Sequence, residues 1–173
     1  MRTRHPWLKT LGGIACAGIV AAPLIVPVTA YAAPSLPPLV INEVIQDNDA
    51  IADAIEVLNL GDTAVDISGW ILADDKNSMP VSEGTVVQPG QYLAITVDDD
   101  TRLDKFGLGK ADQANLKLPD GTLVDTYAWS GHVSTSYGRC VDGTGDFRVT
   151  VEATPNAANA CVATPLGNIK INE

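Results

Sequence analysis

The chain is poor in positive charge and in histidine. Its 173 residues include 11 lysines and arginines against 21 aspartates and glutamates, and only 2 histidines. Because the binding of phosphate groups needs a positively charged surface, this balance argues against nucleic acid as a direct ligand. The acidic residues are spread along the sequence and do not form a tail, which is typical of the soluble surface of an exported protein.

The N-terminus has the pattern of a secretory signal peptide. Three basic residues within the first nine precede an almost wholly apolar run over 11–28, and Ala30 and Ala32 stand where a signal peptidase reads small residues. A run of about 18 residues is borderline for crossing a membrane, and glycines and prolines interrupt this one. We therefore expect cleavage after Ala32, an extracellular location and no membrane association after cleavage. The cleaved chain has 8 basic against 21 acidic residues, a net charge of −13.

Histidine and cysteine are too scarce after the leader for a zinc site, which needs several closely spaced ligands. His132 is the one histidine that remains. Three serines lie near it, Ser130, Ser134 and Ser136, and Asp125 precedes them. No nucleophile elbow or other catalytic signature surrounds these residues, and a serine near a histidine in a loop rich in glycine and serine is expected by chance. We therefore predict no catalytic residue and no enzyme activity.

Two cysteines remain after the leader, Cys140 and Cys161. An even number of cysteines in an exported chain predicts a disulfide. The bond would close a loop of about 20 residues and would stabilise the folded chain by about 3 kcal/mol if loop-closure entropy dominates.

Short β-rich runs separated by turn residues recur after residue 33, and helical periodicity is nearly absent. The sequence predicts nine strands, at 39–46, 54–60, 65–73, 85–87, 91–97, 115–118, 122–129, 136–141 and 147–151. The turn Pro119-Asp120-Gly121 indicates a hairpin, and one or two helical turns are expected around 104–107. This spacing of strands is typical of a β-sandwich.

The run over 65–73 contains a tryptophan that is out of phase with its neighbours. Strict alternation would place Ile67 and Trp70 on opposite faces of the strand. A bulge at Ser68 and Gly69 would restore the phase, because glycine permits the backbone geometry of a bulge. We therefore predict that Trp70 belongs to the core and not to a binding surface.

Nine short motifs follow one another over residues 39–160. They are INEV at 41–44, DAIEVLN at 53–59, DISGWIL at 66–72, PGQYL at 89–93, FGLG at 106–109, DGTLVD at 120–125, SYGR at 136–139, DGTG at 142–145 and TPNAAN at 154–159. In order and spacing they resemble the lamin tail domain, an immunoglobulin-like β-sandwich that also occurs in exported bacterial proteins. Ala54 departs from that pattern, since the family usually carries an aromatic residue there.

The resemblance implies a non-catalytic accessory module for adhesion, spacing or targeting, whose partner would be an unknown protein or cell-envelope ligand. Exported bacterial members occur in tandem and beside hydrolase domains, including nucleases and phosphoesterases, so the resemblance also allows a fragment of such an extracellular enzyme. Asn42, Glu43, Glu56 and Asn59 lie within the apolar strands. Buried polar groups must be hydrogen-bonded, so we expect them to tie strand ends and loops together.

Two groups of aspartates offer an alternative function, that of a calcium-binding extracellular module. They are Asp47, Asp49 and Asp53, and Asp98, Asp99 and Asp100. Calcium takes six to eight oxygen ligands, and neither group matches the complete EF-hand loop pattern. We expect no other cofactor.

The last five residues, IKINE at 169–173, echo LVINE at 39–43. A match directly after the closing motif of the domain predicts the start of a truncated second repeat. The expected organisation is a signal peptide at 1–32, a linker at 33–38, the β-sandwich at 39–161, a second linker at 162–168 and the start of the repeat at 169–173.

Overall fold

The part of the chain that this computed structural model describes, residues 35–46 and 51–162, forms eleven strands and no helix. The strands are β1 (Leu39–Ile45), β2 (Ala54–Asn59), β3 (Val65–Asp66), β4 (Ile71–Ala73), β5 (Ser78–Pro80), β6 (Val86–Val87), β7 (Tyr92–Thr96), β8 (Asp112–Lys117), β9 (Leu123–Trp129), β10 (Ser136–Cys140) and β11 (Asp146–Val149). No helix in those ranges is long and apolar enough to cross a membrane. The expected signal peptide, the expected second repeat, Asp47 and Asp49 lie outside the described residues.

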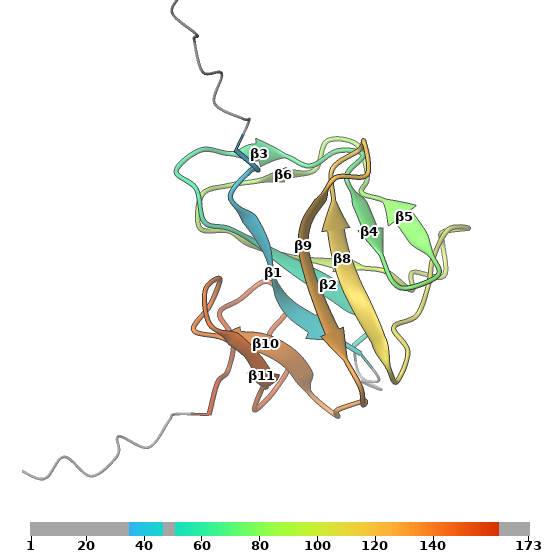
Figure 1. Ribbon diagram of the computed structural model, residues 1–173, viewed down its shortest axis with the longest axis vertical. Coiled ribbons are helices and arrows are strands. Elements are labelled where there is room, and N and C mark those ends of the chain that lie inside the picture. Colours follow the sequence, from blue (N-terminus) through green and yellow to red (C-terminus); the bar gives the residue numbers. More distant parts are fainter. Residues whose placement is uncertain (1–34, 47–50, 163–173) are drawn as a thin grey trace, which may run out of the picture. The chain divides into compact units, whose positions relative to one another are not determined.

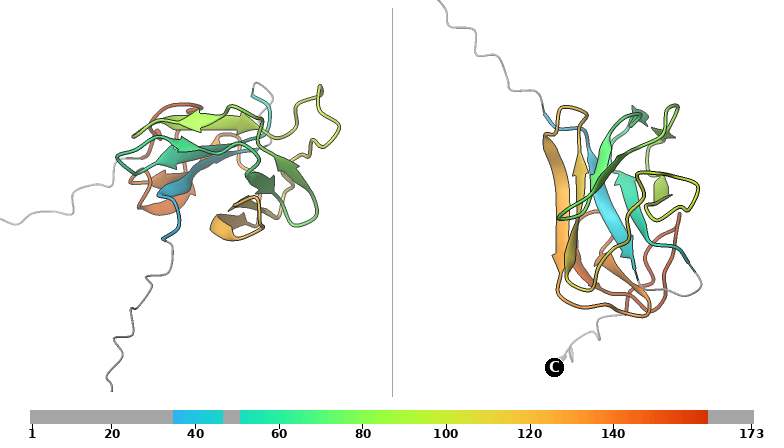
Figure 2. Two further views of the ribbon diagram at one scale, coloured as in Figure 1. Left: turned by 90° about the horizontal axis from the view of Figure 1, so that it is seen from above. Right: turned by 90° about the vertical axis from the view of Figure 1, so that its right-hand side faces the viewer.

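The strands form two facing sheets and a small accessory ribbon. One sheet has the order β11-β10-β1-β2-β7, the other has the order β5-β4-β8-β9, and β3 pairs with β6. Every strand pair is antiparallel. The two larger sheets lie as two layers (Figure 2), and the core fills the space between them. The predicted all-β, immunoglobulin-like sandwich is confirmed.

Figure 1 shows where the chain enters and leaves this sandwich. The described chain begins beside β3, and it ends beyond β11 at the opposite end of the strands. Between β7 and β8 a long loop projects away from the sheets, which Figure 2 shows in yellow-green. Leu103 in this loop is fully exposed.

A bulge in β1 decides which side chains of this strand face the core. The register between β1 and β2 shifts between Ile41 and Glu43. Because a bulge inserts one extra residue, Ile41 and Val44 both join the core although they stand three positions apart. Asn42 and Glu43 therefore fall on the other face of the five-stranded sheet.

The run over 65–73 does not form one bulged strand as predicted. It divides into β3 and β4, which belong to different sheets. Between them the N–H of Trp70 donates to the carbonyl of Ile67 at 3.0 Å, and Gly69 has a φ of 72° that favours glycine. The chain thus turns from the accessory ribbon into the four-stranded sheet at this point. Trp70 is 5% exposed and lies in the core, but a turn places it there.

One further expectation from the sequence was wrong, and one strand was not predicted. The expected helical turns around 104–107 are absent from the described chain, where Phe106 instead donates its N–H to the carbonyl of Val97 at 2.8 Å. This contact holds the side chain of Phe106 in the core, 5% exposed. The sequence also did not predict β5, because Ser78 and Pro80 are poor strand formers and only Met79 of this strand is buried.

A disulfide joins Cys140 to Cys161, as the sequence predicts, with the Cα atoms 5.8 Å apart. It ties the end of β10 to the last described segment of the chain. That segment follows β11 and crosses the outer face of the five-stranded sheet, where it is fixed at its end by the bond.

The substitution Trp70→Ala should lower the free energy of unfolding by about 3–5 kcal/mol, because it empties a large core position. A chemical melt measures the loss. The matched control is Leu103→Ala, which removes an exposed apolar side chain and should change stability by less than about 0.5 kcal/mol. Similar effects from the two substitutions would contradict the core position of Trp70.

Candidate functional site

Two glutamates lie opposite one another on the outer face of the five-stranded sheet. Glu43 of β1 and Glu56 of β2 are register partners, and both are completely buried. The segment that covers them is residues 151–161, which we call the C-terminal strap. A buried carboxylate must be hydrogen-bonded, so the strap must supply donors.

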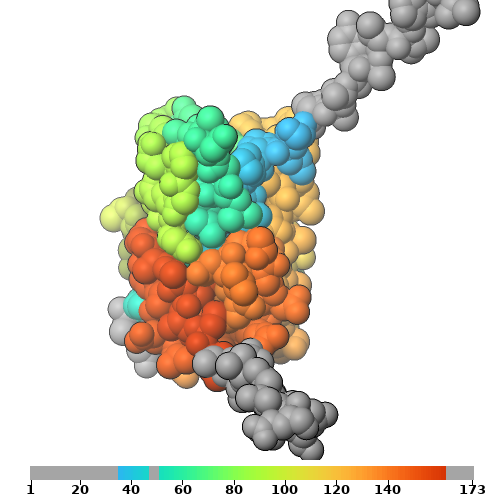
Figure 3. Space-filling model, turned by 90° about the vertical axis from the view of Figure 1, so that its left-hand side faces the viewer, coloured from blue at the N-terminus to red at the C-terminus, as the bar shows by residue number. Residues whose placement is uncertain are grey.

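The strap supplies those donors from its backbone. The N–H of Thr154 donates to both carboxylate oxygens of Glu43 at 3.0 and 3.1 Å, and the N–H of Asn156 donates to Oε2 of Glu56 at 2.6 Å. Ser136 adds a hydroxyl donor to Glu43 at 2.5 Å. In Figure 3 the strap, in red, lies against the yellow-green atoms of the segment that includes β7. There the side chain of Asn156 accepts the N–H of Ala94 at 3.0 Å.

A second set of polar contacts closes the strap near the disulfide. Asn42, in the bulge of β1, donates to Glu56 and to Asp142 at 3.1 Å each and accepts the N–H of Gly143 at 2.9 Å. Asn159 of the strap donates to the carbonyls of Asn42 and Arg139 at 3.0 Å each. The bulge, the β10–β11 loop and the strap therefore form one hydrogen-bonded unit.

Burial changes the acidity of both glutamates. Desolvation raises the pKa of Glu56 to about 7, although the hydrogen bonds from Asn42 and Asn156 oppose the rise. Desolvation also raises the pKa of Glu43, against the hydrogen bonds from Ser136 and Thr154. Each glutamate thus favours its protonated form more in the folded chain than in water.

Asn59 fastens a different corner of the sandwich. Its side-chain nitrogen donates to the carbonyls of Thr63 and Val87 at 2.8 and 2.9 Å, and its oxygen accepts the N–H of Gly61 at 2.9 Å. The end of β2 is thereby connected to the following turn and to β6. Asn42, Glu43, Glu56 and Asn59 all serve the fold through hydrogen bonds inside the described chain.

Of the residues considered for a catalytic triad, Ser136 and Asp125 are engaged elsewhere in the fold, whereas Ser130 and Ser134 are exposed. Ser136 is completely buried and bonded to Glu43. Asp125 accepts the N–H of Ile41 at 2.9 Å and forms an ion pair with Arg139 at 2.9 Å. The two side chains therefore have structural partners in place of a shared substrate.

Three of the aspartates considered for calcium are bonded to other groups of the described chain. Asp53 accepts the N–H of Leu108 at 2.6 Å, Asp99 accepts the N–H of Thr101 at 2.8 Å, and Asp100 pairs with Lys105. Asp98 differs, because its buried Oδ1 has no hydrogen-bond partner in the described residues. The calcium site stays a prediction.

A different group of three carboxylates converges in the described ranges, and the sequence analysis did not identify it. Oxygens of Asp74, Asp75 and Asp112 lie within 4.8 Å of one another. Asp74 is occupied, since it accepts the N–H groups of Lys76 and Asn77. Asp112 accepts the N–H of Gly109 at 2.7 Å. These bonds hold the two loops, and acidic groups commonly gather on a surface without an ion.

The two open sides of the sandwich differ. On one side, aromatic rings bridge β9 to β10 and β11. Tyr127 stacks on Phe147 with ring centroids 3.8 Å apart and lies 5.6 Å from Tyr137, and the guanidinium of Arg139 covers Phe147 at 4.6 Å. This aromatic stack fills the space between the edges of the two sheets.

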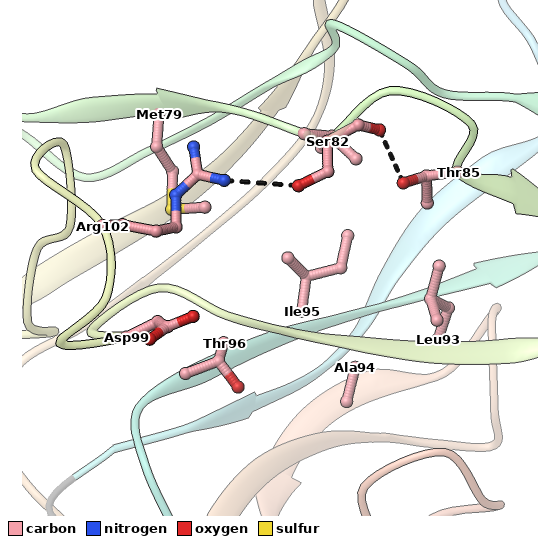
Figure 4. Close-up of a pocket in the computed structure, with 10 residues that line it drawn as sticks. Met79, Ser82, Thr85, Leu93, Ala94, Ile95, Thr96, Asp99 and Arg102 are labelled. Atoms are coloured by element: carbon pink, nitrogen blue, oxygen red, sulfur yellow. Dashed lines mark hydrogen bonds between the residues drawn. The ribbon is translucent and has the colours of Figure 1, made fainter.

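The other side, between β7 and the β5–β6 segment, is hollow. A cavity of about 310 Å³ opens there (Figure 4). We call it the β7 groove; its lining residues are Met79, Val81, Ser82, Thr85, Leu93, Ala94, Ile95, Thr96, Asp99 and Arg102. Four consecutive residues of β7 line it, although successive side chains of a strand point to opposite faces. The groove therefore runs along the edge of β7. Sequence patterns could not identify it, because three separate segments form its walls.

The substitution Glu56→Gln should remove a pH dependence of stability. The pKa of Glu56 is raised, so between about pH 4.5 and 7 the folded chain holds a proton that the unfolded chain has lost. The free energy of unfolding of the wild type therefore falls by about 3 kcal/mol as the pH rises through this window. Chemical melts from pH 4 to 8 should show that the free energy of unfolding of the variant increases by that amount relative to the wild type. The control Glu152→Gln, at an exposed position, should show no such gain. A difference in stability between Glu56→Gln and the wild type that does not change with pH would contradict a raised pKa of Glu56 in the folded chain.

Calcium and magnesium should raise the melting temperature by the same small amount. Calcium at about 10 mM would stabilise a site of typical extracellular affinity by about 1.4–2.7 kcal/mol, whereas magnesium prefers a stricter octahedral geometry and controls for screening. We expect equal shifts because Asp99 and Asp100 are already bonded to Thr101 and Lys105. A larger calcium shift that Asp98→Asn abolishes would establish an ion site in this loop.

Comparison with known proteins identifies the family. The model of the Lamin Tail Domain family matches residues 32–131, more than half of the chain. No curated protein matches it. The matched range contains β1 to β9. The strands β10 and β11, which share the sheet of β1, and the C-terminal strap follow it. Lamin tail domains are non-catalytic and immunoglobulin-like, in agreement with the sandwich described above. The chain therefore belongs to the lamin tail domain family.

Proposed function

We propose that this chain is an exported, non-catalytic accessory module that binds a protein or cell-envelope ligand and so serves in adhesion or targeting. The observation that carries the proposal is that the polar side chains within the strands form hydrogen bonds inside the fold. Glu43 and Glu56 accept hydrogen bonds from the C-terminal strap, and Asn59 donates a hydrogen bond to a turn. The outer surface and the β7 groove are therefore the parts that can meet a partner.

Two observations support export. The basic, apolar and small-residue order of residues 1–32 is that of a signal peptide. The disulfide between Cys140 and Cys161 needs an oxidising compartment to persist. We place the module at 39–161, between linkers at 33–38 and 162–168. The echo of its first strand at 169–173 supports a longer protein, in which a hydrolase or nuclease domain would supply the chemistry and this module the attachment.

A reporter fusion tests the proposal. A secreted phosphatase joined to the C-terminus of the full chain should be recovered on washed cells several-fold more than the phosphatase with a signal peptide alone. Its turnover of a soluble substrate should not change, because the module adds attachment and no chemistry. N-terminal sequencing of the exported fusion should begin at Ala33.

Two results would overturn the proposal. A fusion that stays wholly in the medium would exclude adhesion and targeting. Hydrolysis of a phosphodiester or a nucleic acid by the purified chain without the reporter would show an enzyme. The destabilised Trp70→Ala fusion is the matched control, because it should lose cell attachment while the reporter keeps its turnover.

A further inference from the structure

The strand β7 ends its sheet, so one of its edges has no neighbouring strand in the described chain. The register shows which backbone groups point to that edge. Val97 donates its N–H to the carbonyl of Asp53 at 2.9 Å, and Asn59 donates to Gln91 at 3.2 Å. In an antiparallel ladder the hydrogen-bonded pairs alternate, so Leu93 and Ile95 bond to β2 whereas Ala94 and Thr96 direct their N–H and C=O groups outward.

Most of these outward N–H and C=O groups have no hydrogen-bond partner in the described chain. The N–H of Ala94 is taken by Asn156 of the strap. Within residues 35–46 and 51–162, no partner occupies the carbonyl of Ala94 or the N–H and carbonyl of Thr96. Proteins usually cover a free edge or interrupt it, because such an edge pairs with other chains. β7 is capped at one position and open at the next.

The wall of the groove that faces β7 is formed by β5, an edge strand that is covered by Arg102. β5 is the edge strand of the other sheet, and Pro80 in it has no N–H to offer. Arg102 donates to the carbonyl of Pro80 at 3.0 Å and to the hydroxyl of Ser82 at 3.3 Å. Arg102 is held in turn by Asp104 through two hydrogen bonds of 2.8 and 2.9 Å. Figure 4 shows this side chain extended along the wall opposite Ile95 and Leu93.

The floor of the groove is apolar and its rim is acidic. Leu93 and Ile95 pack against the core but stay partly exposed, beside the buried Met79 and Val81. The charged side chains that line the groove are those of Asp99 and Arg102. Arg102 is paired with Asp104, which neutralises its charge. The carboxylate of Asp99 is therefore the charge that the groove offers to a basic side chain, and Glu83 and Asp98 are acidic neighbours of lining residues in the sequence.

We infer that the β7 groove binds an extended peptide segment with alternating apolar and basic side chains, which adds a strand to the free edge of β7. The peptide bonds to the outward groups of Ala94 and Thr96, its apolar side chains enter between the sheets, and its basic side chains face Asp99. Main-chain bonds supply affinity in this mode of recognition, and side-chain pockets supply specificity. The inference rests on the proposed binding role and names the surface and partner class.

A labelled short peptide of alternating lysine and valine is the probe, with a glutamate–valine peptide as the charge control. Fluorescence anisotropy measures affinity, and amide chemical shifts locate the site. We expect the lysine peptide to bind with shifts centred on Leu93 to Thr96. The glutamate peptide should bind much more weakly, and added salt should weaken the lysine peptide.

Two variants of the full chain test the assignment. Thr96→Pro removes the outward N–H without touching the bonds to β2, and should weaken the lysine peptide about fivefold or more, the effect of one lost hydrogen bond. The matched Thr96→Val keeps the N–H and should bind normally. Asp99→Asn should weaken the peptide about twofold to fivefold at low salt. Asp75→Asn, which removes an exposed charge from a residue outside the groove lining, should not weaken it.

A modified peptide provides a test that does not depend on the folding of a protein variant. The lysine peptide methylated on alternate backbone nitrogens keeps its side chains but loses the donors of one edge, and should lose binding to the wild-type chain. Equal binding of both peptides, shifts centred outside β7, or a wild-type dimer that Thr96→Pro converts to monomers without any peptide binding would overturn the inference. Cell attachment of the reporter that survives Thr96→Pro would refute the groove and leave the proposed function intact.

Discussion

The structure depends on backbone N–H groups of the C-terminal strap that reach two glutamates with no access to water. Glu43 and Glu56 stand on the outer face of the five-stranded sheet, where an uncovered sandwich would place side chains in solvent. Thr154 and Asn156 remove them from solvent and at the same time satisfy them. Without the strap the face would hold two adjacent acids. Without the acids, the strap would lose the acceptors that fix its path across the sheet.

Asn42 connects the strap and the two glutamates to the middle of the five-stranded sheet. The bulge in β1 turns this side chain outward, where it contacts Glu56, Asp142 and the backbone of Gly143. The disulfide holds the far end of the same unit. The family match ends before β10, yet β10 is the hydrogen-bonded neighbour of β1. The last quarter of the described chain is thus a structural part of the sandwich and not an appendage to it.

The strands with regular alternation could be predicted from the sequence, and so could the buried position of Trp70 and the pairing of the cysteines. Each of these depends on local pattern or on a count. The bulge at Asn42 and the division of 65–73 could not be predicted, since both depend on the register with partners far along the chain. The same holds for the acidity of Glu56. A glutamate in an apolar strand indicates burial, but the covering segment lies 100 residues away in sequence.

The candidate site was less accessible to sequence reasoning than the fold. The sequence drew attention to groups of aspartates, of which Asp53, Asp99 and Asp100 are engaged in hydrogen bonds or an ion pair inside the fold. The groove is made from the edge of β7, a segment that begins in β5, and one loop, and no sequence pattern connects these pieces. The two open sides of the sandwich differ in how side chains fill them. Tyr127 and Phe147 stack in one, whereas the other holds a cavity of about 310 Å³ among the described residues.

The chain enters the sandwich at one end of the strands and leaves at the other (Figure 1). Modules built in this way can be joined in series without folding back on themselves. Each copy would then present its β7 edge at a regular interval along a rod-like array. A ligand with repeated segments would meet many weak contacts held at a high effective concentration, so its residence time would increase with the number of copies engaged. Attachment strength in such a protein would be set by how many modules it contains, without any change in the affinity of one.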